Sequence, residues 1–268
     1  MSALDFIKAA RAGGYALAAL NAVNLETAQA AVRAAEAERA PVILQFSQNA
    51  ARYADLRLLA AIGRELRAGA SVPVILHFDH AETPEAAREA LRQGFDGVML
   101  ESDDVALLRG LAGEAHAAGG FLEAEYEVVA KGERAANRHG GSAGELARFI
   151  QDSGCDLLAV SIGSVHKQEA KTSRLDLGRL DELAAQTDLP LVLHGASGVM
   201  EADMTLASRR GISKVNVATE LLLAFTHAVR EQVGDSHDPR LYLGAGRDAY
   251  EARARHVIRL LGASGTAP

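Results

Sequence analysis

The chain has 268 residues, 49% of them apolar, and its 28 Lys and Arg against 35 Asp and Glu give a formal net charge of −7. This length suits one domain with a large core, so we predict a single domain over residues 1–268. The acidic balance argues against nucleic-acid binding, and because we find neither a membrane-spanning apolar run nor a signal-peptide pattern, we expect a cytoplasmic globular protein without a membrane partner.

Short apolar runs alternate eight times with longer amphipathic runs. The predicted strands are Ala16–Ala22, Pro41–Ser47, Pro73–His80, Gly97–Ser102, Phe121–Glu127, Leu157–Gly163, Leu191–Ser197 and Lys214–Thr219. The predicted helices are Leu25–Arg39, Ala54–Arg67, Pro84–Arg92, Val105–Ala118, Ser142–Gln151, Leu177–Gln186, Ala202–Ser208, Leu221–Val233 and a final Ala249–Leu261. The Gly-, Ser- and Ala-rich residues Gly262–Pro268 are expected to fray.

Several of the strand-like runs are almost entirely apolar, as in Pro73–Leu76 and Leu157–Val160. Strands buried on both faces are typical of a parallel sheet covered by helices. Eight βα units in a row favour a closed barrel over an open sheet, and no GxGxxG motif opens the first helix. We therefore predict an α/β fold, a (β/α)₈ TIM barrel with a C-terminal helical extension. The long polar segment Val128–Gly141 is expected to be a functional loop at its rim.

Histidines follow three of the predicted strands, at His80, His166 and His194. The C-terminal ends of barrel strands converge on one mouth, where three imidazoles can hold a zinc ion and leave a fourth position open. A single histidine there is usually a rim residue, but three at matching strand ends favour a shared metal. His77 lies three residues before His80, so on a regular strand it points to the opposite face, and we interpret it as a packing or supporting residue.

A second signal points to phosphate. Gly195–Gly198 follows the seventh predicted strand and Asn216–Glu220 the eighth, and each leads into a helix. Backbone amides at these two places form the recurrent phosphate site of barrel enzymes. A tight turn between strand and helix uses the same residue types, so the position beside His194 is what favours phosphate.

Five segments together resemble the class II, zinc-dependent ketose-bisphosphate aldolases, which include fructose- and tagatose-1,6-bisphosphate aldolases. These segments are Asn21–Thr27, Pro73–His80, Leu191–Gly198, Lys214–Glu220 and Ile258–Gly265. The resemblance extends from Tyr15 to about Gly262, nearly the whole chain. It implies an enzyme that cleaves or forms a carbon–carbon bond next to the carbonyl of a phosphorylated ketose.

The resemblance also implies roles for individual residues. Zinc ligands fall on His80, His166 and His194, with Glu101 and Glu125 near an alternative metal position. Asp79 matches the aspartate that gives a proton to the aldehyde oxygen, and Glu133 matches a mobile glutamate that moves the ketose proton. Substrate and phosphate contacts fall on Asn24, Ser47, Gly195, Ser197, Asn216, Thr219 and, across a dimer interface, Arg253.

The implied cofactor is Zn²⁺, with a monovalent cation, Na⁺ or K⁺, as a further candidate, and the implied assembly is a homodimer or homotetramer. Zinc acts as a Lewis acid, so no Schiff base is needed. In agreement, the predicted strands have no lysine in mid-strand, where a Schiff-base aldolase keeps one.

Two departures leave the substrate open. Lys167 stands where the family has a glycine, and the loop Tyr126–Arg134 lacks three family glycines and an aspartate. The ammonium of Lys167 either faces solvent or reaches an anionic group of the substrate. The leading hypothesis is cleavage of fructose 1,6-bisphosphate, with tagatose 1,6-bisphosphate next. The alternatives are the same chemistry on another phosphorylated or carboxylated substrate, and a non-catalytic zinc-binding paralogue.

Overall fold

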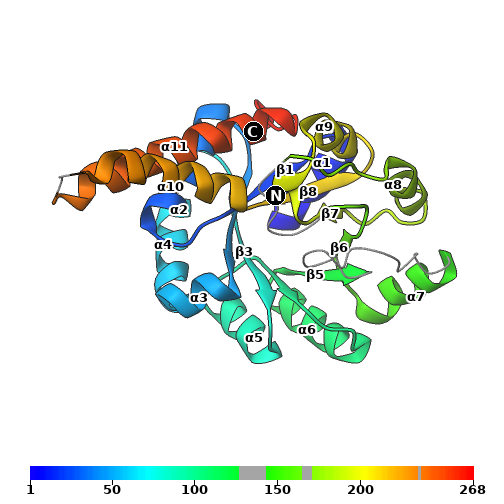
Figure 1. Ribbon diagram of the computed structural model, residues 1–268. Coiled ribbons are helices and arrows are strands. Elements are labelled where there is room, and N and C mark those ends of the chain that lie inside the picture. Colours follow the sequence, from blue (N-terminus) through cyan, green and yellow to red (C-terminus); the bar gives the residue numbers. More distant parts are fainter. Residues whose placement is uncertain (127–142, 165–170, 235–236) are drawn as a thin grey trace.

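The computed structural model describes residues 1–126, 143–164, 171–234 and 237–268. Eight parallel strands form a closed barrel in chain order, and the first strand pairs with the last (Figure 1). They are β1 (Leu17–Asn21), β2 (Val42–Ser47), β3 (Val74–Ala81), β4 (Gly97–Leu100), β5 (Phe121–Tyr126), β6 (Leu157–Val160), β7 (Leu191–Leu193) and β8 (Ile212–Val217). The predicted (β/α)₈ barrel is confirmed.

Helices surround the barrel (Figure 1). They are α1 (Ala3–Gly13), α2 (Leu25–Glu38), α3 (Gln48–Ala54), α4 (Leu56–Gly69), α5 (Pro84–Arg92), α6 (Val105–Ala117), α7 (Ala143–Ser153), α8 (Leu177–Ala184), α9 (Glu201–Ser208), α10 (Thr219–Val233) and α11 (Pro239–Leu260), with a 3₁₀ turn η1 (Ala196–Gly198). Helices α1 and α3 were not predicted, and α11 begins ten residues earlier than expected. In the described part of the chain, no helix is long and apolar enough to cross a membrane.

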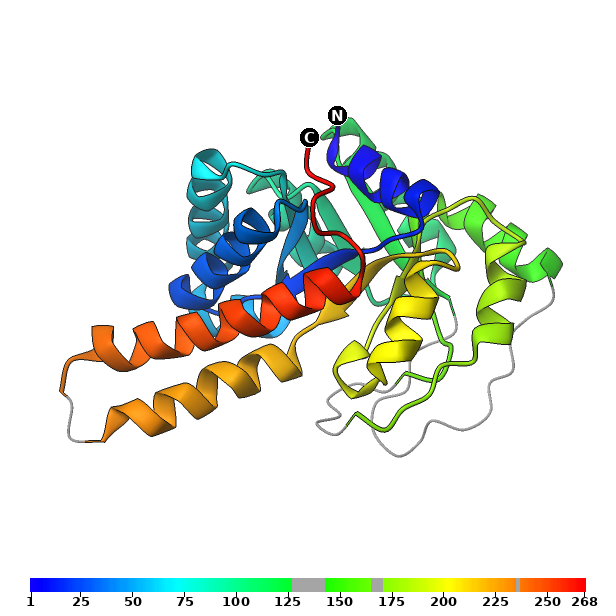
Figure 2. The same ribbon diagram turned by 90° about the horizontal axis from the view of Figure 1, so that it is seen from above.

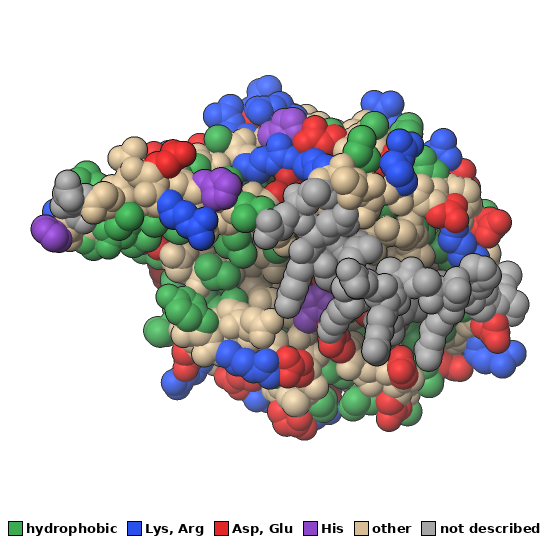
Figure 3. Space-filling model, viewed as in Figure 1, with side chains coloured by type: hydrophobic (Ala, Val, Ile, Leu, Met, Phe, Trp, Pro, Cys, Tyr) green, Lys and Arg blue, Asp and Glu red, His purple; other side chains and the backbone are tan. Residues whose placement is uncertain are grey.

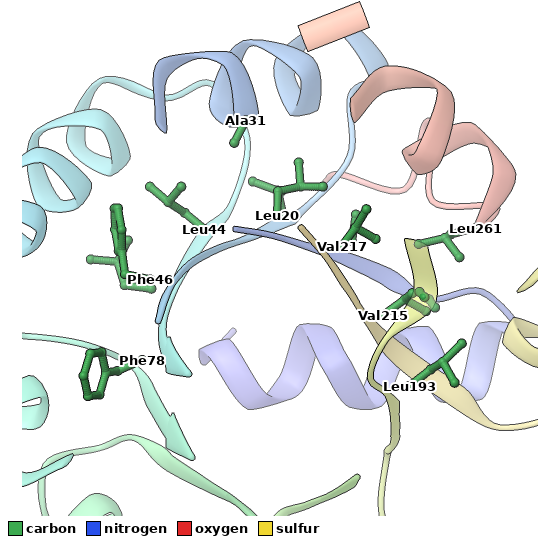
Figure 4. Packing of buried hydrophobic residues seen from close by; sticks show 14 of the residues in the cluster. Leu20, Ala31, Leu44, Phe46, Phe78, Leu193, Val215, Val217 and Leu261 are labelled. Atoms are coloured by element: carbon green, nitrogen blue, oxygen red, sulfur yellow. The ribbon is translucent and has the colours of Figure 1, made fainter. Parts of the chain in front are cut away.

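Alternation along the strands separates two packing layers. Outward side chains such as Leu20, Leu44 and Val215 are fully buried against the helices (Figure 4). Inward side chains such as Ile43 and Phe121 fill the N-terminal half of the barrel interior. A fully buried side chain of this size contributes about 1.5–3 kcal/mol. The N-terminal half of the barrel interior is therefore an apolar core.

Helix α1 closes the N-terminal end of the barrel. Its Ile7 and Ala10 are fully buried in the same cluster as the inward side chains of the strands. The helix begins with a capping box between Ser2 and Asp5, a local signal that was present in the sequence. The guanidinium of Arg11 donates to the backbone carbonyls of residues 184, 187, 189 and 211, which ties α1 to the barrel floor.

Helices α10 and α11 lie antiparallel and form a long arm that extends away from the barrel (Figure 2). Helix α11 returns along α2 and packs Tyr250, Ala254 and Val257 into the main core. The Tyr250 hydroxyl donates to the carbonyl of Asn21 at 3.0 Å, at the end of β1. The C-terminal extension is thus an integral part of the fold.

The prediction that the tail frays is wrong. The Ser264 hydroxyl donates to the Glu38 carboxylate at 3.0 Å, and the backbone amides of Gly265 and Ala267 donate to the carbonyls of Glu38 and Arg39. Arg255 and Arg259 pair with the same carboxylate at 2.8 and 2.6 Å. The composition of the tail did not reveal these partners, because they lie more than 200 residues away in the sequence.

Candidate active site at the barrel mouth

The inward side chains change from apolar to polar as each strand approaches its C-terminal end. In β3, Ile75 is followed at two-residue steps by His77 and Asp79. The same alternation places polar side chains inside the barrel from three more strands: Gln45 and Ser47 from β2, Glu123 and Glu125 from β5, and Lys214 and Asn216 from β8. Inside the barrel Gln45 contacts His77, Glu123 contacts Lys214, and Asn216 contacts Asp79. These polar side chains line the barrel interior near the C-terminal ends of the strands.

Strand β3 corrects the face that we expected for His77, while its interpretation as a packing or supporting residue stays a prediction. We expected His77 and His80 on opposite faces, but His77 is fully buried inside the barrel, where its Nδ1 lies 3.1 Å from Gln45 Oε1. The pairing of β3 with β4 shifts register between Phe78 and Ala81, and His80 adopts a left-handed conformation with φ 53°. This dislocation turns His80 toward the mouth as well. Such a backbone conformation is uncommon outside glycine and clusters at functional sites.

His194 follows β7 directly and is fully buried. Its Nε2 lies 2.7 Å from Glu123 Oε1, so the ring donates its Nε2–H to the carboxylate and keeps the lone pair on Nδ1. A carboxylate behind a histidine is the usual arrangement when the opposite ring nitrogen binds a metal.

His80 has a carboxylate behind it in the same way. Its Nδ1 lies 2.7 Å from Glu101 Oε1, which leaves Nε2 as the ligand nitrogen, 3.7 Å from Asp79 Oδ2. Burial lowers the pKa of His80, but the carboxylates of Asp79, Glu101 and Glu125 outweigh it and raise the pKa to about 9. A metal ion that binds His80 therefore replaces a proton.

The donor set fits a metal ion. The rings of His80 and His194 pack edge to face at the mouth with their centroids 5.1 Å apart and an interplanar angle of 67°. Within the described residues, Asp79, Glu123 and His194 also offer ligand atoms within 4.8 Å of one another. Glu123 is already held by His194 and Lys214, so we assign it to the support of His194 rather than to the metal. Two imidazoles and a nearby carboxylate remain, a set that zinc accepts.

Lys214 corrects a second expectation. Strand β8 begins two residues earlier than predicted, so Lys214 lies in mid-strand, fully buried in the barrel. Its Nζ lies 2.8 Å from Glu123 Oε2 and donates to Asn216 Oδ1 at 2.7 Å. A Schiff base requires a neutral amine, whereas this lysine is paired with a buried carboxylate. Burial would raise the pKa of Glu123, but the Lys214 ammonium and the hydrogen bond from His194 lower it below its usual range.

Asp79 lies beside the two histidines and is only 4% exposed. Asn216 donates from Nδ2 to Asp79 Oδ1 at 3.2 Å. Burial would raise the pKa of Asp79, but His80 and Lys214, followed by His194 and His77, lower it. Asp79 is therefore a carboxylate at neutral pH, ready to accept a proton from a group at the mouth.

The predicted phosphate loops lie above β7 and β8. Gly195 directly precedes the turn η1 and has φ 65°, a left-handed conformation that favours glycine. Ser197 in this turn is 6% exposed, and its hydroxyl accepts the backbone amide of Glu220 at 3.3 Å. Thr219 is the first residue of α10. The two loops are thus joined at the N-terminus of a helix, where backbone amides attract anions.

Three predicted substrate contacts have partners within the chain. Asn24 and Ser47 cap α2 and α3. Their side chains accept hydrogen bonds from the backbone amides of Thr27 and Ala50, respectively. Arg253 pairs with Glu220 and, at 2.9 Å, with Glu201. Burial lowers the pKa of Arg253, but the two carboxylates raise it overall. A substrate phosphate would have to compete with these two carboxylates for Arg253.

His166, Glu133 and Lys167 lie outside the described residues, and their assignments stay predictions. The sequence analysis missed Gln45, Glu123 and Lys214. Each precedes a chosen site residue by two positions on the same strand, at Ser47, Glu125 and Asn216. Alternation of inward side chains was therefore the signal that could have found them.

Basic and acidic side chains are interspersed on the face shown in Figure 3, with no broad basic area in view. On this face, recognition of an anion would rest on a local site such as the joined loops above β7 and β8. The chemistry that the mouth offers is metal binding by imidazoles, proton transfer by Asp79 and anion binding at a helix N-terminus.

The comparisons with known proteins point in the same direction. The family model described as fructose-bisphosphate aldolase class-II matches residues 1–266. A fructose-bisphosphate aldolase of Staphylococcus epidermidis is 34% identical over 280 residues, covering 96% of each chain. A fructose-bisphosphate aldolase of Geobacillus stearothermophilus is 33% identical over 284 residues, covering 100% of this chain and 98% of the relative.

The similar solved structures are aldolases as well. The YdjI aldolase of Escherichia coli K12 superposes with a TM-score of 0.87 at 28% identity, covering 100% of this chain and 99% of that one. A putative fructose-1,6-bisphosphate aldolase of Coccidioides immitis superposes with a TM-score of 0.86 at 29% identity, covering 98% and 97%.

Proposed function

The chain belongs to the class II fructose-bisphosphate aldolase family, a group of metal-dependent aldolases, and we propose that its substrate is fructose 1,6-bisphosphate. Cleavage would give dihydroxyacetone phosphate and an aldehyde phosphate. The observation that carries the proposal is the pair of imidazoles at the mouth, each backed by a carboxylate, beside the ionised Asp79.

We propose that His80 and His194 hold a zinc ion together with His166. When bound, the metal supplies a Lewis acid that polarises the ketose carbonyl. Asp79 then takes the proton of the C4 hydroxyl as the C3–C4 bond breaks, and it returns that proton to the aldehyde oxygen in the reverse direction. Glu133 would deliver a proton to the carbon that cleavage leaves on the ketose fragment.

The joined loops above β7 and β8 would hold a substrate phosphate. Gly195 and Ser197 lie on one loop, while Asn216 near the end of β8 and Thr219 at the start of α10 flank the other. Asn216 already donates one amide hydrogen to Asp79, and its second amide hydrogen can bond a substrate oxygen. A monovalent cation, Na⁺ or K⁺, is a further candidate at this loop pair.

A second substrate class is favoured by one residue. Lys167 replaces a family glycine next to a proposed zinc ligand, and its ammonium could bind an additional anionic group. Such a contact is worth about 1.5–3 kcal/mol, or roughly ten- to a hundredfold in affinity. Reverting Lys167→Gly would then weaken one anionic substrate selectively, whereas unchanged or improved affinity would favour an ordinary ketose bisphosphate.

We also propose a cytoplasmic enzyme that forms a homodimer or homotetramer. Highly charged sugar phosphates do not cross membranes unaided, which supports the location. The family's use of Arg253 across a dimer interface supports the assembly, and sedimentation analysis would test it.

The deciding experiment is a retro-aldol assay on the purified protein with fructose and tagatose 1,6-bisphosphates and phosphorylated sugar acids. We expect cleavage of a ketose bisphosphate, loss of activity with a chelator, and recovery on adding zinc. His194→Ala should lose most of its zinc while the barrel stays folded. Cleavage that survives complete metal removal, or zinc-loaded protein that cleaves none of these compounds, would overturn the proposal.

A further inference from the structure

The proposed metal ligands and Asp79 do not explain why the barrel encloses a charged lysine. Lys214 and Glu123 are both fully buried, and their ion pair of 2.8 Å crosses the barrel from β8 to β5. A buried ion pair gains little stability over apolar residues of similar size, because desolvation offsets the attraction. The pair therefore calls for a reason other than stability.

One arm of the pair leads to a metal ligand. Glu123 binds Lys214 through Oε2 and His194 through Oε1, at 2.8 and 2.7 Å. With both oxygens held, the carboxylate has a fixed plane, and it fixes the ring of His194 with Nδ1 on the side away from Glu123. The orientation of His194 is thus set through Glu123 by Lys214.

The other arm leads to the proton-transfer residue. Lys214 donates to the amide oxygen of Asn216 at 2.7 Å, and the amide nitrogen of Asn216 donates to Asp79 at 3.2 Å. An amide can turn by 180° and exchange its oxygen and nitrogen. The ammonium can donate only to the amide oxygen, so the N–H₂ group must face Asp79.

We propose that Lys214 is a positioning residue for the reaction, which holds His194 through Glu123 and Asp79 through Asn216. A single buried cation would thereby orient the metal ligand and the proton-transfer carboxylate together. The inference rests on the proposed function in so far as His194 binds the metal and Asp79 moves the proton.

The test uses two isosteric variants of the full chain. Lys214→Met removes the ammonium and leaves the Glu123 carboxylate buried without its cation. The double variant Lys214→Met with Glu123→Gln removes both charges, and its Gln oxygen still accepts the Nε2–H of His194. Arg67→Met is a matched control, because it removes a cation from the partly buried Asp96, 2.9 Å away and outside the mouth.

Three readouts separate positioning from stability. Zinc affinity is measured by competition with a chromophoric chelator, the ligand geometry by the visible spectrum of the Co²⁺-loaded protein, and cleavage by kcat and KM. The first two need no substrate, so they decide the His194 arm even if the proposed reaction fails.

We expect Lys214→Met to lose 10- to 100-fold in zinc affinity and to shift the cobalt spectrum, as changes behind a metal ligand do. The double variant should keep much of the loss in zinc affinity, because the side chain at position 123 still lacks the cation that fixes its plane. It should also keep a low kcat with little change in KM, because Asn216 is no longer oriented toward Asp79. Arg67→Met should lower the melting temperature alone. Wild-type zinc affinity and spectrum in Lys214→Met, or a wild-type kcat in the double variant, would overturn the proposal.

Discussion

Replacing Glu101 should separate support of a metal ligand from direct metal binding. Glu101 resembles a carboxylate at an alternative metal position, yet its Oε1 lies 2.7 Å from Nδ1 of His80. Glu101→Ala removes this hydrogen bond, whereas Glu101→Gln keeps an oxygen that can accept it. The carboxylate is 31% exposed at the mouth, so neither change should disturb the core.

The expected loss follows from this geometry. Glu101→Ala removes the hydrogen bond that holds Nδ1 of His80, and loss of such a supporting partner costs about 10–100-fold in metal affinity, or about 1.4–2.7 kcal/mol. Glu101 also helps to raise the pKa of His80 to about 9, so below that pH zinc must displace a proton. Glu101→Ala lowers this pKa and weakens the proton's competition. The deficit relative to wild type should therefore be larger near pH 8.5 than near pH 6.

The assay is chelator competition for zinc at several pH values, with wild type, Glu101→Ala and Glu101→Gln in parallel. We expect wild-type affinity to rise with pH up to about 9 and Glu101→Gln to lie within a few-fold of wild type. If Glu101→Gln loses as much affinity as Glu101→Ala at every pH, Glu101 is a direct ligand and the reasoning is refuted.

Three further outcomes are expected. Glu133→Ala should slow exchange of the ketose α-proton with solvent, while Asp79→Asn should spare that exchange and block carbon–carbon cleavage; equal losses in both variants would contradict these roles. Gly97→Ala places a Cβ 2.2 Å from the ring of Phe121, so thermal denaturation should show about 1–3 kcal/mol of overpacking. Burial raises the pKa of Cys155 to about 11, so alkylation at pH 8 should be at least about 100-fold slower in the native than in the unfolded protein, and equal rates would refute its burial.

The sequence predicted the fold well because the barrel depends on a repeated physical pattern. Eight apolar runs must each be covered by a helix, and this requirement is visible in runs such as Pro73–Leu76. Helix α3 was missed because it lies between β2 and α4, with only seven residues to show a period. Helix α11 was shortened because its first ten residues pack along α10, outside the barrel pattern.

The candidate site was predicted in part. Strand-end positions indicated His80 and His194 because barrel topology brings such positions together, whereas Asp79 was assigned from the family resemblance. The same rule could not place His77, because it assumes a regular strand and β3 is dislocated at His80. It also missed Lys214, since a charged residue next to a predicted loop is ordinarily exposed. Only the three-dimensional structure shows that this charge has a buried partner.

The anchoring of the tail has a consequence for the order of folding. Glu38 ends α2 near the start of the chain, yet its carboxylate is satisfied by Arg255, Arg259 and Ser264, which are 217 to 226 residues away. Contacts at such separation carry the largest loop-closure cost and form late.

During synthesis on the ribosome, the first βα units emerge at least ten seconds before these partners, at rates of about 5–20 residues per second. Throughout that interval the face of α2 that α11 later covers is exposed, and the barrel has no β8 with which to close. The apolar face of α2 therefore stays exposed to solvent until α11 is made, and we expect a chaperone to act at this face of α2.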